Sequence, residues 1–209
     1  MMHSIGDAAT DACLDAIEQA QVANPPWDRR PCITHAFLAD SKTVARFRRC
    51  NVTLNAQAQW AIPDALHLNT IRARLGDPRW RRYYPTKSFV DGGVTVSIGA
   101  DGIASGSIVI YRPIQALEQA HTRRRFGSPD GDFAPEASQC LSLPEILYGY
   151  TLAGAYQTRM EHVVGSLEVG KLADLIVLDM NVFDALPHEI HKARVLLTMM
   201  NGRVTHDAL

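Results

Sequence analysis

Two histidines and one aspartate stand where a predicted parallel sheet can assemble a metal site. His3 precedes a predicted helix, His35 ends a short predicted strand, and Asp101 follows a later strand in Ile-Gly-Ala-Asp-Gly102. Neutral imidazole nitrogen and carboxylate oxygen are ordinary ligands of zinc and similar divalent ions. Each residue alone also has a simpler explanation: a frayed terminus for His3, a histidine bonded to a backbone carbonyl for His35, and a turn cap for Asp101.

Two further motifs also have an interpretation without chemistry. His188 and His191 are three residues apart, close enough on a helix to share a metal, but no third ligand is in view, which favours a solvated face. The segment 79–84, Arg-Trp-Arg-Arg-Tyr-Tyr, mixes cations and aromatic rings as single-strand nucleic-acid sites do. In a chain of near-neutral charge, a packed loop with cation–π contacts is the better interpretation.

Composition narrows the class of protein. The 209 residues carry 21 Lys and Arg against 22 Asp and Glu, a net charge of −1, which argues against nucleic acid or an anionic membrane as the main partner. The four cysteines form no Cys-x-x-Cys pair and no dense framework, so reduced thiols are expected. A basic and apolar leader and an apolar run of about 18 residues are both absent from the sequence. We therefore expect a cytoplasmic protein without a membrane partner.

The elements that must position these residues alternate along the chain. Helices are predicted over 8–22, from Asp40 or Ser41 through Phe47, around 68–75, over 87–91, over 112–123, and from a capping box at Ser142 and Glu145. Strands are predicted over 31–36, 51–57 and 94–98. This alternation favours βαβ units and a parallel sheet with functional residues at the carboxyl ends of its strands.

The last fifty or so residues have a different character. Residues 172–178 form an apolar strand after a Gly-Lys turn, and 195–200 is joined to 203–205 by Asn201-Gly202, a strong hairpin signal. Antiparallel β structure around one helical or loop segment near Pro187 is therefore expected.

Taken in chain order, these motifs resemble the amidohydrolase superfamily, specifically the amidohydrolase 3 group of metal-dependent hydrolases. The most specific part is Gly165–Asp179, Gly-Ser-Leu-Glu-Val-Gly-Lys-Leu-Ala-Asp-Leu-Ile-Val-Leu-Asp, followed by Val-Leu-Leu-Thr-Met-Met-Asn-Gly-Arg203. The resemblance covers nearly the whole chain and places it as the C-terminal part of a longer protein. It implies a (β/α)8 barrel with one or two metals and a small β-sandwich.

The resemblance also implies a role for each candidate residue. His3 matches the metal ligand after the fifth barrel strand and His35 the ligand after the sixth. Asp101 matches the carboxylate after the eighth strand, which contacts the metal, takes a proton from the attacking water and delivers it to the leaving nitrogen. The implied substrate is a small molecule with an amide-like carbon–nitrogen bond.

Departures from the family pattern limit what this chain does alone. The opening His-x-His pair of the family occurs nowhere, and only two residues precede His3, so the strand that positions it is expected to be missing. Thr34 stands where a Glu is common, and Ala100 where Ser is frequent. A complete barrel needs about 250 residues, and at about 30 residues per unit this chain holds four or five units.

The sequence thus predicts an α/β fold: a partial (β/α)8 barrel over residues 1–160, followed by antiparallel strands of a small β-sandwich over 161–209. The expected metal ligands are His3, His35 and Asp101, with Asp101 also catalytic and zinc the expected ion. The predicted activity is hydrolysis of a non-peptide carbon–nitrogen bond, by an incomplete fragment. The alternative is an inactive half-barrel that acts as a scaffold or pairs with another copy or a complementing chain, since an open half-barrel exposes sheet edges.

Overall fold

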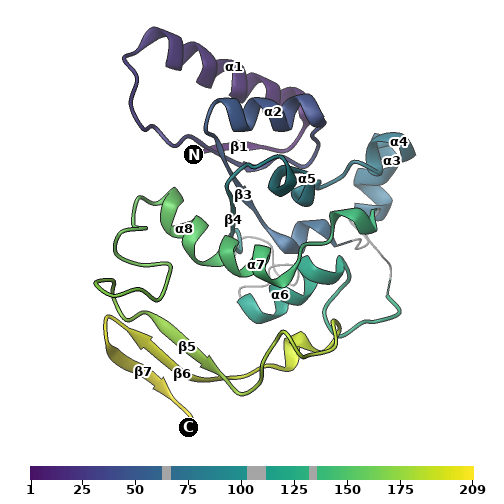
Figure 1. Cartoon of the computed structure of the whole chain (residues 1–209). Coiled ribbons are helices and arrows are strands. Elements are labelled where there is room, and N and C mark those ends of the chain that lie inside the picture. Colours follow the sequence, from purple (N-terminus) through teal and green to yellow (C-terminus); the bar gives the residue numbers. More distant parts are fainter. Residues whose placement is uncertain (63–66, 103–111, 132–135) are drawn as a thin grey trace.

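The computed structural model describes residues 1–62, 67–102, 112–131 and 136–209, which form a mixed α/β fold with two separate sheets (Figure 1). The first is parallel, with the strands in chain order: β1 (Met2–Ser4), β2 (Cys32–His35), β3 (Thr53–Ala56) and β4 (Val96–Ile98). The second is antiparallel: β5 (Leu175–Leu178), β6 (Val195–Met200) and β7 (Arg203–Asp207). The antiparallel sheet lies at the opposite end of the molecule from the first two helices.

Helical segments connect and follow the parallel strands. The long crossovers are α1 (Asp7–Ala23) between β1 and β2 and α2 (Ser41–Arg49) between β2 and β3. Between β3 and β4 lie η1 (Ala58–Ala61), η2 (His67–Arg72), α3 (Ala73–Leu75), α4 (Asp77–Trp80) and α5 (Thr86–Asp91). After β4 come α6 (Pro113–Thr122), η4 (Ala137–Gln139), α7 (Leu143–Tyr150), α8 (Leu152–Gln157) and η5 (Ile190–Lys192).

The start of the chain corrects one expectation. We predicted no strand to position His3, but Met2–Ser4 pairs in parallel with β2, with His3 opposite Thr34. Three residues suffice because the neighbouring strand supplies the hydrogen-bonding partners, which a local hydrophobic pattern does not reveal.

A single apolar core lies against the parallel sheet. Ile33, Leu54 and Val96 occupy neighbouring register positions on β2, β3 and β4 and are all buried. Phe47 of α2 and Phe89 of α5 are fully buried, with ring centroids 4.8 Å apart in an edge-to-face arrangement. The parallel sheet is buried on both faces, which explains why the sequences of its strands are short apolar runs, as is typical of parallel sheets.

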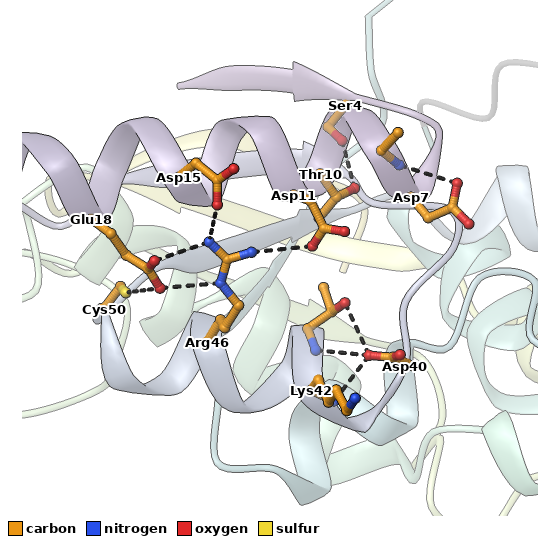
Figure 2. Close-up of polar contacts among 12 residues, drawn as sticks. Ser4, Asp7, Thr10, Asp11, Asp15, Glu18, Asp40, Lys42, Arg46 and Cys50 are labelled. Atoms are coloured by element: carbon orange, nitrogen blue, oxygen red, sulfur yellow. Dashed lines mark hydrogen bonds and ion pairs between the residues drawn. The ribbon is translucent and has the colours of Figure 1, made fainter.

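Local signals at the helix and hairpin ends match the structure. Asp40 is the N-cap of α2, and its Oδ1 accepts hydrogen bonds from the backbone amides of Lys42 and Thr43, both at 2.9 Å (Figure 2). Asn201 and Gly202 both have positive φ, 49° and 73°, as a two-residue hairpin turn of this type requires.

The helix predicted around 68–75 is irregular. Residues 67–72 form a π-helix and only Ala73–Leu75 is α-helical, before Gly76 turns the chain with a φ of 72°. Periodicity alone does not distinguish these helix types.

The aromatic rings of segment 79–84 belong to the core. Trp80, Tyr83 and Tyr84 are 6%, 1% and 2% exposed, and the rings of Trp80 and Tyr83 stack with centroids 4.8 Å apart. Rings buried to this extent are not available to stack on bases, as single-strand recognition requires.

His191 does not lie on a solvated face, which corrects that expectation for the His188–His191 pair. Its Nδ1 lies 2.7 Å from Oε2 of Glu118, a carboxylate on α6 whose side chain is only 1% exposed. The backbone amide of His191 donates to the same oxygen at 2.8 Å, and the amide of Gly127 donates to Oε1 at 2.7 Å. Glu118 therefore ties η5, and the antiparallel sheet beyond it, to α6.

An ion-pair network joins α1 to α2. Arg46 of α2 reaches Asp11, Asp15 and Glu18 on α1 (Figure 2). Arg49 adds a 2.6 Å contact to Glu18. Hydrogen bonds from the two guanidinium groups lower the pKa of Glu18 from 4.5 to about 2. The network holds the two helices in register over the sheet.

This network predicts acid sensitivity. Because the folded pKa of Glu18 is depressed, its contribution to stability is present above about pH 4.5 and is lost as the pH falls towards 2. We expect the urea midpoint of the wild-type chain to fall across this window, and to fall less in Glu18→Gln. An equal fall in both proteins, measured from about pH 6 to about pH 2.5, contradicts the prediction. High salt reduces the difference because the pairs are partly exposed.

Within the described residues, no helix is both long and apolar enough to cross a bilayer.

Candidate metal centre

The parallel sheet brings the three predicted site residues to its carboxyl edge. His3 lies in β1, His35 is the last residue of β2, and Asp101 follows β4 by three residues. The rings of His3 and His35 meet edge-on, with centroids 4.5 Å apart. The Nε2 atom of His35 lies 3.9 Å from Oδ2 of Asp101. The fold therefore gathers two imidazoles and a carboxylate from segments far apart in the sequence.

The backbone adopts an unusual conformation at the end of β2 and after β4. His35, Ala36 and Asp101 have φ values of 73°, 43° and 58°, in the left-handed region that side-chain-bearing residues rarely adopt. Such positions cost about 1 to 3 kcal/mol each and persist where the surroundings fix them. Here the amide of Ala36 donates to the carbonyl of Ser4 at 2.8 Å, which fixes the end of β2 against β1.

Gln57, the residue directly after β3, sets the orientation of His35. Its side-chain amide nitrogen lies 3.0 Å from Thr34 Oγ1 and 2.8 Å from Asn55 Oδ1, both of which accept. The carbonyl oxygen of Gln57 must then face His35, and lies 2.8 Å from its Nδ1. His35 accordingly donates from Nδ1, so the lone pair of Nε2 points towards Asp101.

Burial keeps His35 neutral. The residue is 5% exposed, and loss of solvation lowers its pKa, against the opposing effects of Gln57 and Asp101. A neutral imidazole with a free Nε2 is the form that binds a metal ion. His3 is exposed, and the side chain of Asp101 is 35% exposed. The site is therefore accessible to solvent from this side.

Asp101 is held by the segment that follows β3. The indole Nε1 of Trp60 donates to Asp101 Oδ2 at 3.1 Å, and Nε2 of Gln59 donates to the carbonyl of Ala100 at 2.6 Å. Gln57, Gln59 and Trp60 were not predicted from the sequence as residues of this site. The available signal was their place directly after a predicted strand, at the edge where functional residues gather.

The donor chemistry suits a divalent ion, but the described residues do not complete a site. His35 Nε2 and Asp101 Oδ2 lie 3.9 Å apart, and an imidazole nitrogen and a carboxylate oxygen are both ordinary ligands of a divalent ion. Among the described residues, however, no group of three His, Cys, Asp or Glu side chains is placed to hold a metal ion. Further ligands or a shift of His3 are needed.

Comparison with known proteins decides the family. The sequence profile described as the Amidohydrolase family matches residues 1–206. The chain belongs to this family.

Two curated relatives align along almost all of this amidohydrolase chain. It is 29% identical to "Protein LONG AFTER FAR-RED 3" of Arabidopsis thaliana, over 97% of this chain and 33% of that protein. It is 27% identical to an N-substituted formamide deformylase of Arthrobacter pascens, over 99% of this chain and 36% of that protein. The chain thus spans about a third of the length of these relatives.

Solved structures share the fold. An uncharacterized metal-dependent hydrolase from Pyrococcus horikoshii superposes with a TM-score of 0.70 at 24% identity, covering 89% of this chain and 34% of that one. An adenosine deaminase from Xanthomonas campestris with bound zinc gives a TM-score of 0.62 at 16% identity, covering 99% of this chain and 51% of that one. At these identities the likeness concerns the fold.

Proposed function

We propose that this chain forms one part of a metal-dependent amidohydrolase that cleaves a non-peptide carbon–nitrogen bond in a small, amide-like molecule. The observation that carries the proposal is the meeting of His3, His35 and Asp101 at the carboxyl edge of the parallel sheet. Residues 1–160 supply part of a (β/α)8 barrel, and residues 161–209 supply strands of a small β-sandwich. The N-substituted formamide acted on by the Arthrobacter relative supports an amide-like substrate.

Each of the three site residues has its own role in this proposal. His3 and His35 would hold the ion through ring nitrogens and Asp101 through its carboxylate, with zinc the ion we propose. A bound zinc ion supplies Lewis acidity: it lowers the pKa of water and polarises a carbonyl. Among the described residues Oδ1 of Asp101 has no hydrogen-bond partner, which leaves it to accept a proton from the attacking water and pass it to the leaving nitrogen.

Completion of the site requires further polypeptide. Within the described residues, β1 and β4 each pair with a strand on one side only. Open edges of a parallel sheet expose unpaired backbone groups that favour association with other strands. We propose that a complementing segment, from a longer form of the same protein, another chain or a second copy, adds the remaining strands and ligands. Without it, the chain is a scaffold that does not hydrolyse the substrate.

Zinc binding tests the proposal. We expect the assembled protein to bind zinc in a saturable manner and to release amine from N-substituted amides. Both properties should be lost in His35→Asn and Asp101→Asn. The matched control is His162→Asn, which removes an imidazole that is 83% exposed and far from this edge in sequence. Equal zinc binding by all four proteins would falsify the metal assignment and favour the scaffold role.

A further inference from the structure

A recess lies between α2, α5 and the residues after α4, outside the candidate metal centre. It encloses about 710 Å³, within the range of about 300 to 1,000 Å³ typical of small-molecule sites. Its lining contains none of His3, His35 and Asp101. The lining residues are Ala39, Asp40, Ser41, Val44, Ala45, Arg48, Arg81, Arg82, Pro85, Ser88, Asp91, Gly92 and Gln139. We call it the arginine groove.

Three arginine side chains line the arginine groove, and few carboxylates lie close enough to neutralise their charge. Arg48 is held in place by a hydrogen bond from its Nη1 to the carbonyl of Gly93. Among the described residues, the one carboxylate paired with Arg81 is that of Glu136, at a distance of 3.9 Å. Arg82 is exposed, and within the described residues it forms no ion pair.

The two carboxylates of the lining are already engaged elsewhere. Asp40 Oδ1 caps α2 by accepting from the amides of Lys42 and Thr43. Asp91 is ion-paired with Lys87, one turn earlier on α5. The lining carries three arginines against two aspartates, a net charge of +1, and an anion is the chemistry that complements it.

Close packing shapes this site before any ligand arrives. A Cβ on Gly93 would lie 1.9 Å from Arg48 Nη1, and a Cβ on Gly92 would lie 2.3 Å from Val44 Cγ1. The glycine pair thus lets α2 approach the end of α5 and lets Arg48 lie across the backbone. A preorganised guanidinium loses less side-chain entropy on binding an anion.

The floor of the arginine groove is apolar, and hydrogen bonds between Gln139 and Ser88 hold one of its walls in place. Ala39, Val44 and Pro85 are buried lining residues. Gln139 bonds Ser88 twice, through Nε2 to Oγ at 2.9 Å and through Oε1 to the amide at 3.1 Å. A ligand with an apolar body and an acidic end matches this combination of floor and cations.

We propose that the arginine groove binds a small organic anion, in which a phosphate or carboxylate group meets Arg48, Arg81 and Arg82 and an apolar portion rests on Ala39, Val44 and Pro85. This site is additional to the metal centre. One segment of the chain connects the two sites. Leu38 lies in sequence between His35 and the groove residue Ala39, and it forms an antiparallel bridge with Tyr83.

Titration with phenyl phosphate, benzoate and inorganic phosphate tests the proposal. With the full chain at constant ionic strength, we expect saturable NMR shifts at α2 and α5 for the aromatic anions and weaker binding of inorganic phosphate. Tighter binding of phenyl phosphate than of benzoate identifies the phosphate group as the preferred end, and the reverse identifies the carboxylate.

Arg82→Gln should weaken binding about tenfold, the cost of one charge-assisted hydrogen bond. Because Arg82 is exposed, this variant keeps the fold; Arg48→Gln is the second variant. The matched control, Arg203→Gln on exposed strand β7, removes the same charge elsewhere and should leave the affinity unchanged. Absence of saturable binding, or an equal loss in Arg203→Gln, would overturn the proposal.

Discussion

Replacement of Glu118 by alanine is expected to lower the free energy of unfolding by about 2 to 4 kcal/mol, because three hydrogen-bond donors lose their common acceptor. The donors are the amide of Gly127 and both the amide and Nδ1 of His191. Their carboxylate partner is 1% exposed, so little water can replace it without rearrangement. The part of the chain that depends on this contact is η5 and the strand β6 that follows it.

Hydrogen exchange of individual backbone amides distinguishes the detachment of η5 from α6 from a general loss of stability. In Glu118→Ala we expect the amides of β6 to exchange faster with solvent than those of β2 and β3, because Glu118 joins η5 to α6. Glu168→Ala is the matched control, since that carboxylate is 62% exposed and, among the described residues, pairs only with Lys171 and Ser166. An unchanged urea midpoint in Glu118→Ala would show that the contact does not hold the sheet in place.

The sequence predicts the parts of the fold that depend on short-range patterns. The alternation of Val94, Val96 and Ile98 marks β4, and the turn residues Asn201 and Gly202 mark the hairpin. These signals succeed because strand faces and positive φ values impose a residue type at a defined position.

The parts that were missed depend on partners distant in the chain. Glu118 and His191 are 73 residues apart, and no local pattern pairs a helix carboxylate with a histidine in a later loop. Gln57 meets His35 from 22 residues away. At the candidate metal centre, sequence therefore indicated the residues that could act on a substrate, and only the structure revealed those that orient them.

Replacement of Gln57 by leucine is expected to weaken zinc binding by the assembled protein about 10- to 100-fold, the usual effect of removing the group that orients a ligating histidine. This expectation rests on the proposed metal role of His35. Leucine has a similar volume but cannot accept the proton of Nδ1. His35 is then free to adopt the tautomer protonated at Nε2, which has no lone pair facing Asp101.

The tautomer itself provides a readout that does not depend on metal. In the wild-type chain, long-range proton–nitrogen NMR correlations should show His35 protonated at Nδ1, and in Gln57→Leu a mixture of tautomers. Gln59→Leu is the matched control: Gln59 is 2% exposed, against 1% for Gln57, but its side chain donates to the carbonyl of Ala100 and not to His35. Both variants lose a buried amide, but the Gln57 side chain has more hydrogen-bond partners than that of Gln59, so a larger drop in stability is expected from Gln57→Leu. Only Gln57→Leu should change the tautomer, and a single Nδ1-protonated form in that variant would show that Gln57 does not orient the ring.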